Sequence, residues 1–161
     1  MFVTHIFQPV FDENSRVLIL GTMPSPKSRE LGFYYGHPRN RFWPVMADIF
    51  EEEYPQTPDE KIAFCHRNRI AVWDVLKSCE ITGADDNSIR NPIPNDMNII
   101  LKAAPVKAVF GTGSKACALY QKYCLPDTGV PIIRLPSTSP ANCGTSYESL
   151  RKAYLEIKLY L

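Results

Sequence analysis

Four short runs rich in apolar and β-branched residues recur along this chain, separated by loops and by segments with helical periodicity. The runs cover Val17 to Thr22, Ile70 to Val75, Lys107 to Gly111 and Pro131 to Leu135. Short, continuously apolar runs are typical of strands that are buried on both faces of a parallel sheet. Parallel strands need right-handed crossover connections, whose helices cover both faces. The pattern therefore predicts an α/β fold, a three-layer α/β/α domain with a central four-stranded parallel sheet.

The segments between the runs contain helical signals. After the first run, apolar residues follow the i, i+3, i+4, i+7, i+8 spacing of a helix at Phe42, Val45, Met46, Ile49 and Phe50. A second helix is expected to open at Asp59, and two later ones are expected to be capped by Asn95 and by Ser114. The last helix is expected to begin at a capping box formed by Thr145 and Glu148.

Composition and charge narrow the class of protein. The 161 residues are 45% hydrophobic and 22% charged, which suits one core of ordinary size, so a single domain over residues 1–161 is expected. The formal net charge is only +1, so affinity for nucleic acid must come from a local patch.

Several classes of site and location are disfavoured. No apolar run approaches the roughly 18 to 20 residues of a membrane span, and the N-terminal segment does not resemble a signal peptide. We therefore expect no membrane contact and a cytoplasmic location. The five cysteines are scattered singly, which predicts reduced thiols and no metal site.

The loop after the first run contains a local patch of positive charge. Between residues 21 and 41 the chain has one acidic residue, Glu30, and four basic ones, Lys27, Arg29, Arg39 and Arg41, so the formal charge is +3. Aromatic rings interleaved with basic side chains suit stacking of a base and neutralisation of its phosphates. Ligands of open α/β sheets bind beyond the carboxyl ends of the strands, so the site is expected within residues 21–41, 74–95, 111–115 and 136–145.

Two motifs in these segments are similar to those of a known family. The first segment resembles the first motif of the mismatch-specific branch of the uracil-DNA glycosylase superfamily, a G-x-N-P-like turn followed by GF-x-x-x-HP-x-NRFW. The matching residues are Gly21, Pro24, Gly32, Phe33, His37, Pro38, Asn40, Arg41, Phe42 and Trp43. The segment LPSTSPAN, Leu135 to Asn142, resembles the second motif, a Pro/Ser-rich loop that presses into the DNA minor groove.

Departures from these motifs point to one branch of the superfamily. Met23 occupies the position of the water-activating Asn or Asp, and a thioether cannot polarise water. The His or Asn that contacts the base in the second motif falls near Ser137, or at Leu135 if the alignment slides by two residues. Both losses resemble the hypoxanthine-DNA glycosylase branch, in which the Asn of HP-x-N is the key catalytic side chain. In this chain that residue is Asn40.

The resemblance implies a monofunctional DNA glycosylase that flips out a deaminated base and hydrolyses its N-glycosidic bond in base excision repair. Hypoxanthine is favoured as the base, and uracil is the second candidate. The expected partner is double-stranded DNA containing the deaminated base, with single-stranded DNA as a further candidate. No cofactor and no obligate protein partner are expected, and a monomer is the default.

The resemblance also assigns binding residues. The base is expected to contact Met23 through nearby backbone amides, together with Phe33, Tyr34, Tyr35, His37 and Ser78. Asp74 and Ser88 are candidates for the pocket floor. The DNA strand is expected to contact Lys27, Arg39, Arg41, Ser114, Lys115, Ser137, Ser139, Pro140, Ala141 and Asn142.

Four alternatives stay open at this point. Asn40 could cap the helix that begins near Phe42 instead of acting in catalysis. The enzyme could be a uracil or G:U mismatch glycosylase. Since the usual water activator is missing, the chain could also bind damaged DNA without cutting it. Lastly, Gly111 to Lys115 resembles an incomplete phosphate-binding turn, so a nucleotide-binding enzyme is a further candidate.

Overall fold

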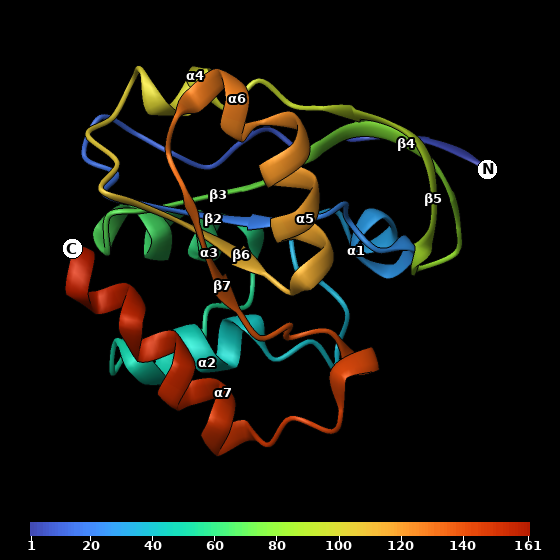
Figure 1. Cartoon of the computed structure of the whole chain (residues 1–161). Coiled ribbons are helices and arrows are strands. Elements are labelled where there is room, and N and C mark those ends of the chain that lie inside the picture. The colour runs from blue at the N-terminus through green and yellow to red at the C-terminus, as the bar shows by residue number, and fades with distance from the viewer.

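The computed structural model describes residues 1–161 and places the four predicted strands in one parallel sheet (Figure 1). These strands are β2 (Val17–Gly21), β3 (Ile70–Asp74), β6 (Ala108–Thr112) and β7 (Ile132–Leu135), in the order β3-β2-β6-β7. All three neighbouring pairs are parallel. The predicted fold class is therefore confirmed.

Helices cover both faces of this sheet. In the strand order, the connection from β2 leads to β3 on one side, and the connection from β6 leads to β7 on the other side. Because both connections are right-handed, their helices lie on opposite faces of the sheet. The first crossover contains α2 (Phe42–Ile49) and α3 (Pro58–Arg67), and the other contains α5 (Ser114–Tyr123) and α6 (Leu125–Thr128). The C-terminal α7 (Tyr147–Tyr154) and the 3-10 helix η2 (Leu155–Tyr160) follow β7, and Figure 1 shows α7 beside α2.

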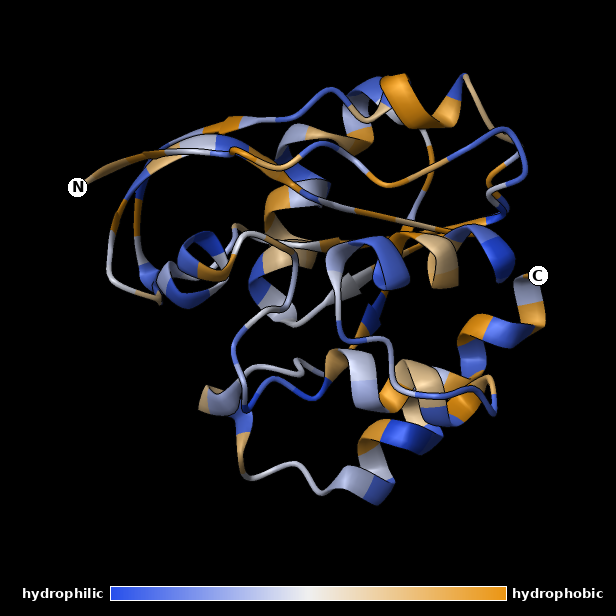
Figure 2. Ribbon diagram, turned by 180° about the vertical axis from the view of Figure 1, so that it is seen from behind, coloured by the Kyte–Doolittle hydropathy of each residue, from blue (hydrophilic) through white to orange (hydrophobic).

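The core lies between the sheet and its helices. Strands β2 and β3 are buried along their whole length, and Figure 2 shows hydrophobic residues concentrated on the central strands. Large aromatic side chains are fully buried in this core, among them Trp43, Phe42, Phe64 and Phe110. The Trp43 indole donates a hydrogen bond of 2.9 Å to the carbonyl of Tyr34, which anchors the aromatic loop to α2.

A second, antiparallel sheet was not predicted. It consists of β1 (Phe2–Thr4), β4 (Leu76–Thr82) and β5 (Asp85–Pro94) in the order β1-β4-β5. The sequence signal is weak because β5 is mostly exposed and the β4-β5 register contains irregularities. Two features could have revealed the hairpin. Buried and exposed residues alternate in β4, and Gly83, between the two strands, adopts φ +59.

Four predicted helix starts are wrong. Helix α3 begins at Pro58 and is capped by Thr57, one residue before the expected opening at Asp59. Helix α4 (Asn98–Leu101) begins after Met97, because the Asn95 side chain binds strand carbonyls instead of capping. Helix α5 is preceded by Gly113 at φ +97, a conformation that favours glycine, and Ser114 is its first helical residue. Helix α7 is capped by Ser146, which accepts a hydrogen bond from Ser149, so the capping box at Thr145 and Glu148 does not form.

The Asn95 side chain joins the two sheets. Its buried amide donates to the carbonyl of Asp74, where β3 ends, at 3.0 Å, and to that of Leu76, where β4 begins, at 3.1 Å. Its own backbone amide donates to the carbonyl of Val75 at 2.8 Å. One residue therefore satisfies the backbone carbonyls at the bend that leads from the parallel sheet into the antiparallel one.

We predict that Asn95→Ala lowers the free energy of unfolding by about 1–3 kcal/mol, because two buried carbonyls lose their partner. Urea unfolding followed by circular dichroism measures the change. The exposed Asn87, whose side chain makes no hydrogen bond, supplies the control variant Asn87→Ala, which should stay within about 0.5 kcal/mol of the native protein. Equal stabilities of the two variants would contradict a joining role for Asn95.

Candidate active site

The four predicted segments meet at one cavity at the carboxyl ends of β2, β3 and β6. The cavity has a volume of about 270 Å³, close to that of the smallest ligand pockets. Its walls come from the turn after β2, the loop over residues 34–40, the β4-β5 hairpin and the loop after β7. Asp74 and Thr112, which end β3 and β6, also line it.

The aromatic loop contributes two of its three rings. Tyr34 and Tyr35 line the cavity, whereas Phe33 packs against Trp43 with a centroid separation of 6.2 Å and does not line it. One face of Tyr35 stacks on Phe42 at 3.9 Å with an interplanar angle of 12°, so that face is closed to a ligand. The Tyr34 hydroxyl donates to the carbonyl of Gln8 at 2.9 Å, which holds this ring in place.

The two tyrosine hydroxyls are neutral groups. Burial raises the pKa of Tyr35 well above its ordinary value, and the negative charge of Asp74 raises it further. Burial and Asp74 have the same effects on the pKa of Tyr34. The Tyr35 hydroxyl lies 3.3 Å from the hydroxyl of Thr112, so it takes part in a hydrogen bond at the end of β6.

Asn40 is a wall residue of the cavity and also contacts the start of α2. Its Oδ1 accepts a hydrogen bond from the backbone amide of Phe42 at 2.9 Å, although the cap position itself is Arg41. The Asn40 backbone amide donates to the carbonyl of His37 at 2.9 Å. These contacts fix the side chain through its oxygen and leave Nδ2 without a partner in the protein. The capping and catalytic hypotheses for Asn40 are thus compatible.

Met23 and His37 complete this side of the cavity. Both are partly buried and line it, and the Met23 side chain, which the motif resemblance aligns with a water-activating residue, brings no nitrogen or oxygen atom to the cavity. The His37 Nδ1 accepts a hydrogen bond from the backbone amide of Arg39 at 3.0 Å, which fixes the loop before Asn40.

The loop after β7 is held by its own hydrogen bonds. Ser137 Oγ accepts from the amide of Ser139 at 3.1 Å, and Ser139 Oγ accepts from that of Ala141 at 3.2 Å. The Asn142 amide group donates to the carbonyl of Ser137 at 2.9 Å. These bonds surround the short 3-10 helix η1 (Pro140–Asn142), and residues 137–141 line the cavity.

Arg41 joins this loop to α2. Its guanidinium donates to the carbonyl of Thr145 at 2.6 Å and to that of Asn142 at 3.0 Å. Its backbone amide donates to the carbonyl of Thr138 at 3.1 Å. The side chain predicted to contact DNA is thus engaged with the loop, and its contact with a phosphate stays a prediction.

The remaining predicted DNA-binding and base-binding residues lie outside the cavity walls. Lys27 lies 3.5 Å from Glu30 in helix α1 (Pro26–Leu31), and Arg39 is exposed. Ser114 and Lys115 open α5. Ser78 is buried in β4, and Ser88 bonds within the β4-β5 hairpin.

One side-chain contact at the cavity was not predicted from the sequence. His5, beside β1, donates from Nε2 to Oδ2 of Asp74 at 2.8 Å, and the two side chains are only 3% and 5% exposed. Asp74 was predicted at the pocket floor, but His5 lies 69 residues away and no local pattern pairs the two.

Neither metal-binding nor membrane-spanning features appear. No group of three or more His, Cys, Asp or Glu side chains is arranged to hold a metal ion, and all five cysteines are free thiols. None of the helices is long and apolar enough to cross a membrane.

Comparison with known proteins identifies the family. The model of the uracil DNA glycosylase superfamily matches residues 8–158, and the chain belongs to this superfamily. It is similar to a hypoxanthine DNA glycosylase of Methanosarcina barkeri, 36% identical over 112 residues that make up 68% of this chain and 71% of the relative. A hypoxanthine DNA glycosylase of Methanosarcina acetivorans is 31% identical over 137 residues, which are 84% of this chain and 86% of the relative.

A solved structure has the same fold. It is the solution NMR structure of a protein from Methanosarcina acetivorans that is provisionally described as a uracil DNA glycosylase. The two structures superpose with a TM-score of 0.80 at 30% identity, covering 98% of this chain and 99% of the other. Together these findings establish the protein as a DNA glycosylase.

We predict that Arg41→Lys loosens the loop after β7, because an ammonium group cannot reproduce the two-point contact of the guanidinium. Hydrogen exchange of the Asn142 and Thr145 amides, which bond within the loop, should become about 5- to 30-fold faster. Arg39→Lys, at an exposed position whose side chain makes no hydrogen bond, should leave both rates unchanged. Unchanged exchange in Arg41→Lys would show that the loop does not depend on this side chain.

Proposed function

We propose that this DNA glycosylase is a monofunctional enzyme that excises hypoxanthine, with uracil as the second candidate base. The hypoxanthine preference is supported by the names of two relatives and by Met23 at the position of the usual water activator. The description of the solved relative favours testing uracil beside it. The observation on which the catalytic assignment depends is the unpartnered Nδ2 of Asn40 at the cavity wall.

The reaction begins with base flipping. A base inside a duplex is unreachable, so the target nucleotide must leave the stack, at a cost of a few kcal/mol. We expect the cavity to offset this cost through contacts of the base with the Tyr35 ring and with backbone amides near Met23. In the loop after β7, we expect Ser137 and Ser139 to contact flanking phosphates, and Pro140 to Asn142 to fill the gap in the duplex.

Hydrolysis then exchanges one bond at C1′ of the sugar for another. The C1′–N bond breaks with its electron pair leaving on the base, water oxygen bonds to C1′, and a water proton neutralises the departing base. The transition state has oxocarbenium character on the sugar and negative charge on the base, which fixed dipoles stabilise. Because Asn40 Oδ1 is bound to the Phe42 amide, its N–H groups are held as donors toward the base or the attacking water.

Excision assays test this proposal. Matched duplexes carrying one deoxyinosine or one deoxyuridine are incubated with the protein under single-turnover conditions, and alkaline strand scission reveals the abasic product. We expect cleavage at deoxyinosine, with Asn40→Ala about 100- to 1,000-fold slower because one preorganised donor is lost. Single strands carrying the same lesions test the further candidate substrate.

A matched variant separates catalysis from capping. Asn40→Asp keeps an oxygen that can accept from the Phe42 amide but removes the Nδ2 donors. If the donors act in catalysis, this variant keeps the native unfolding temperature and loses excision as Asn40→Ala does. Full activity in Asn40→Asp would show that Asn40 only supports the start of α2.

The same assays separate the alternatives. Cleavage at deoxyuridine alone would assign the enzyme to uracil. Binding of both duplexes without cleavage would reject the enzymatic proposal in favour of a damaged-DNA-binding protein.

A further inference from the structure

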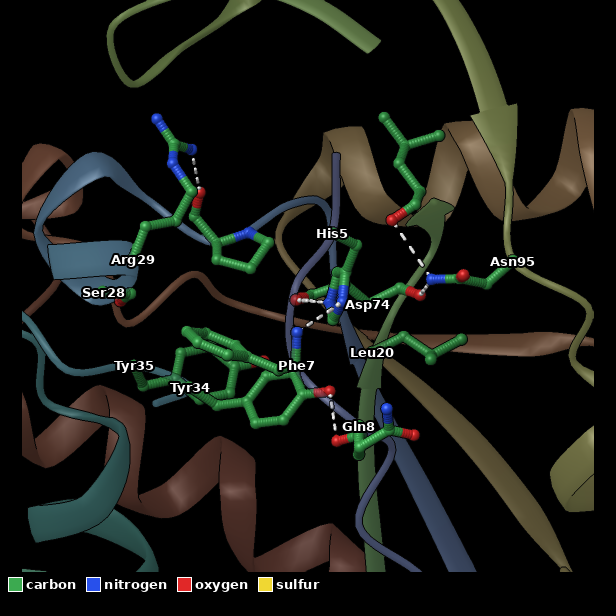
Figure 3. Close-up of polar contacts among 12 residues, drawn as sticks. His5, Phe7, Gln8, Leu20, Ser28, Arg29, Tyr34, Tyr35, Asp74 and Asn95 are labelled. Atoms are coloured by element: carbon green, nitrogen blue, oxygen red, sulfur yellow. Dashed lines mark hydrogen bonds and ion pairs between the residues drawn. The ribbon is translucent and has the colours of Figure 1, made fainter. Parts of the chain in front are cut away.

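The proposed reaction leaves one carboxylate of the cavity without a role. Two aspartates line the cavity, Asp74 and Asp86, and no lysine or arginine does. Figure 3 shows that Asp74 is engaged: its Oδ2 accepts a hydrogen bond from Nε2 of His5 at 2.8 Å. Asp86 comes from the tip of the β4-β5 hairpin, where the local hydrogen bonds of Asn87 and Ser88 are made with Asp85 instead. The Asp86 side chain is therefore available to a ligand.

The two aspartates lie at different depths. The Asp74 side chain is only 5% exposed at the end of β3, whereas Asp86 is exposed at the hairpin tip, which Figures 1 and 2 show beside α1. A flipped nucleotide enters an active-site pocket base first, so its sugar and phosphates stay at the mouth. Of the two carboxylates, Asp86 is thus the one at the depth of the sugar.

The Asp86 carboxyl group faces the protein although the residue is exposed. Burial raises the pKa of Asp86 above its ordinary value, the positive charge of Lys115 opposes this, and the negative charges of Asp85 and Asp74 add to it. Asp74 and Lys115 belong to β3 and α5, on other sides of the cavity mouth. A carboxyl group that is affected by both of them points inward from the hairpin.

A carboxylate at this mouth works against DNA binding. The phosphates beside a flipped nucleotide approach the mouth, and like charges repel. No cation neutralises Asp86, because the ion pairs of the chain are made by Asp12, Glu30, Asp48, Glu52 and Asp74. The negative charge of Asp86 therefore lowers affinity for the substrate, and its use must lie in the chemistry of the bound nucleotide.

That chemistry creates a positive charge that no other assigned group opposes. The sugar acquires oxocarbenium character as the C1′–N bond breaks. The Nδ2 hydrogens of Asn40 are donors, which suit the departing base or the water oxygen but not a cation. Neutral His37 is also a donor, because its Nδ1 accepts from the Arg39 amide and its proton then lies on Nε2. A carboxylate supplies the negative charge that these groups lack.

We propose that Asp86 is a second catalytic residue, whose carboxylate opposes the positive charge on the sugar and accepts a hydrogen bond from the attacking water. The water oxygen bonds to C1′ while the C1′–N electron pair leaves on the base. The proton that the water loses passes to Asp86 and then through solvent to the base. The assignment rests on the proposed glycosylase function, and it gives the chain a water activator although Met23 is aligned with the usual one.

Asp86→Asn tests the proposal because it removes the charge with almost no change in shape. We expect single-turnover excision of deoxyinosine to fall about 100-fold, at the lower end of the range for proton transfer by a positioned side chain. Affinity for the same duplex, measured by fluorescence anisotropy, should rise about 2- to 5-fold, because one exposed repulsive charge is lost. A merely structural role of Asp86 would not move binding and excision in opposite directions.

The same hairpin tip contains a matched control. Asp85 is the neighbouring carboxylate but does not line the cavity. Its Oδ1 accepts from the Asn87 amide at 3.0 Å, a bond that the oxygen of an asparagine keeps. Asp85→Asn removes the same charge from the tip, so it should also bind the duplex more tightly, but it should excise deoxyinosine at the native rate.

A small carboxylate added to the solution should replace the missing one. Asp86→Ala leaves space at the mouth, and we expect sodium formate to raise its excision rate about fivefold over sodium chloride at equal ionic strength. Formate should not accelerate the native enzyme or Asn40→Ala, because the first keeps its carboxylate and the second lacks a donor. Deoxyuridine is the substrate in all these assays if it is the lesion that the native enzyme cuts.

The outcomes separate this proposal from the one on which it rests. If the native protein cuts either lesion and Asp86→Asn cuts it equally fast, the assignment of Asp86 is wrong while the glycosylase function stands. A fall in Asp86→Asn without recovery of Asp86→Ala in formate also rejects the assignment, because the hairpin and not the charge would then matter. If the native protein cuts neither lesion, the proposed function fails, and the catalytic role of Asp86 fails with it.

Discussion

The parallel pairing of β2 with β3 is the constraint on which the site depends. Its register sets Gly21 opposite Asp74, and a side chain at Gly21 would overlap the carboxylate. The pairing of β2 with β6 then brings Thr112 to the same edge, where its hydroxyl donates to the carbonyl of Leu20 at 3.3 Å. A shift of one residue in either pairing would turn these side chains to the other face of the sheet.

Four consecutive residues at the start of α2 connect this edge to the rest of the cavity. Asn40 presents its amide at the wall, and Arg41 holds the loop after β7. Phe42 supports the ring of Tyr35, and Trp43 holds the carbonyl of Tyr34. Successive residues at a helix start point in different directions, so one short stretch orients two of the cavity walls, the loop over residues 34–40 and the loop after β7. The motif NRFW therefore has a structural role beside the catalytic role that we propose for Asn40.

How much of this could be predicted depends on how local each signal is. The parallel strands were predictable because continuous burial leaves continuous apolar runs, as in Val17 to Leu20. Asn40 and the loop after β7 were found through motifs that are contiguous in the chain. The pairing of His5 with Asp74 was not predictable, because it depends on the tertiary placement of β1 against β4. The start of α7 was missed by one residue because Thr145 and Ser146 are both capable caps.

The antiparallel sheet has a consequence for how this cavity can vary. Its hairpin supplies Ile81, Gly83, Ala84 and Asp86 to the wall, whereas the donors of Asn40 and the ends of β2 and β3 come from elsewhere. The hairpin tip is exposed and turns at Gly83, so its length can change without disturbing the parallel sheet. The wall that the hairpin supplies is thus structurally separable from the wall that holds Asn40. Lengthening or shortening this one exposed turn would change the volume of the cavity while leaving Asn40 in place.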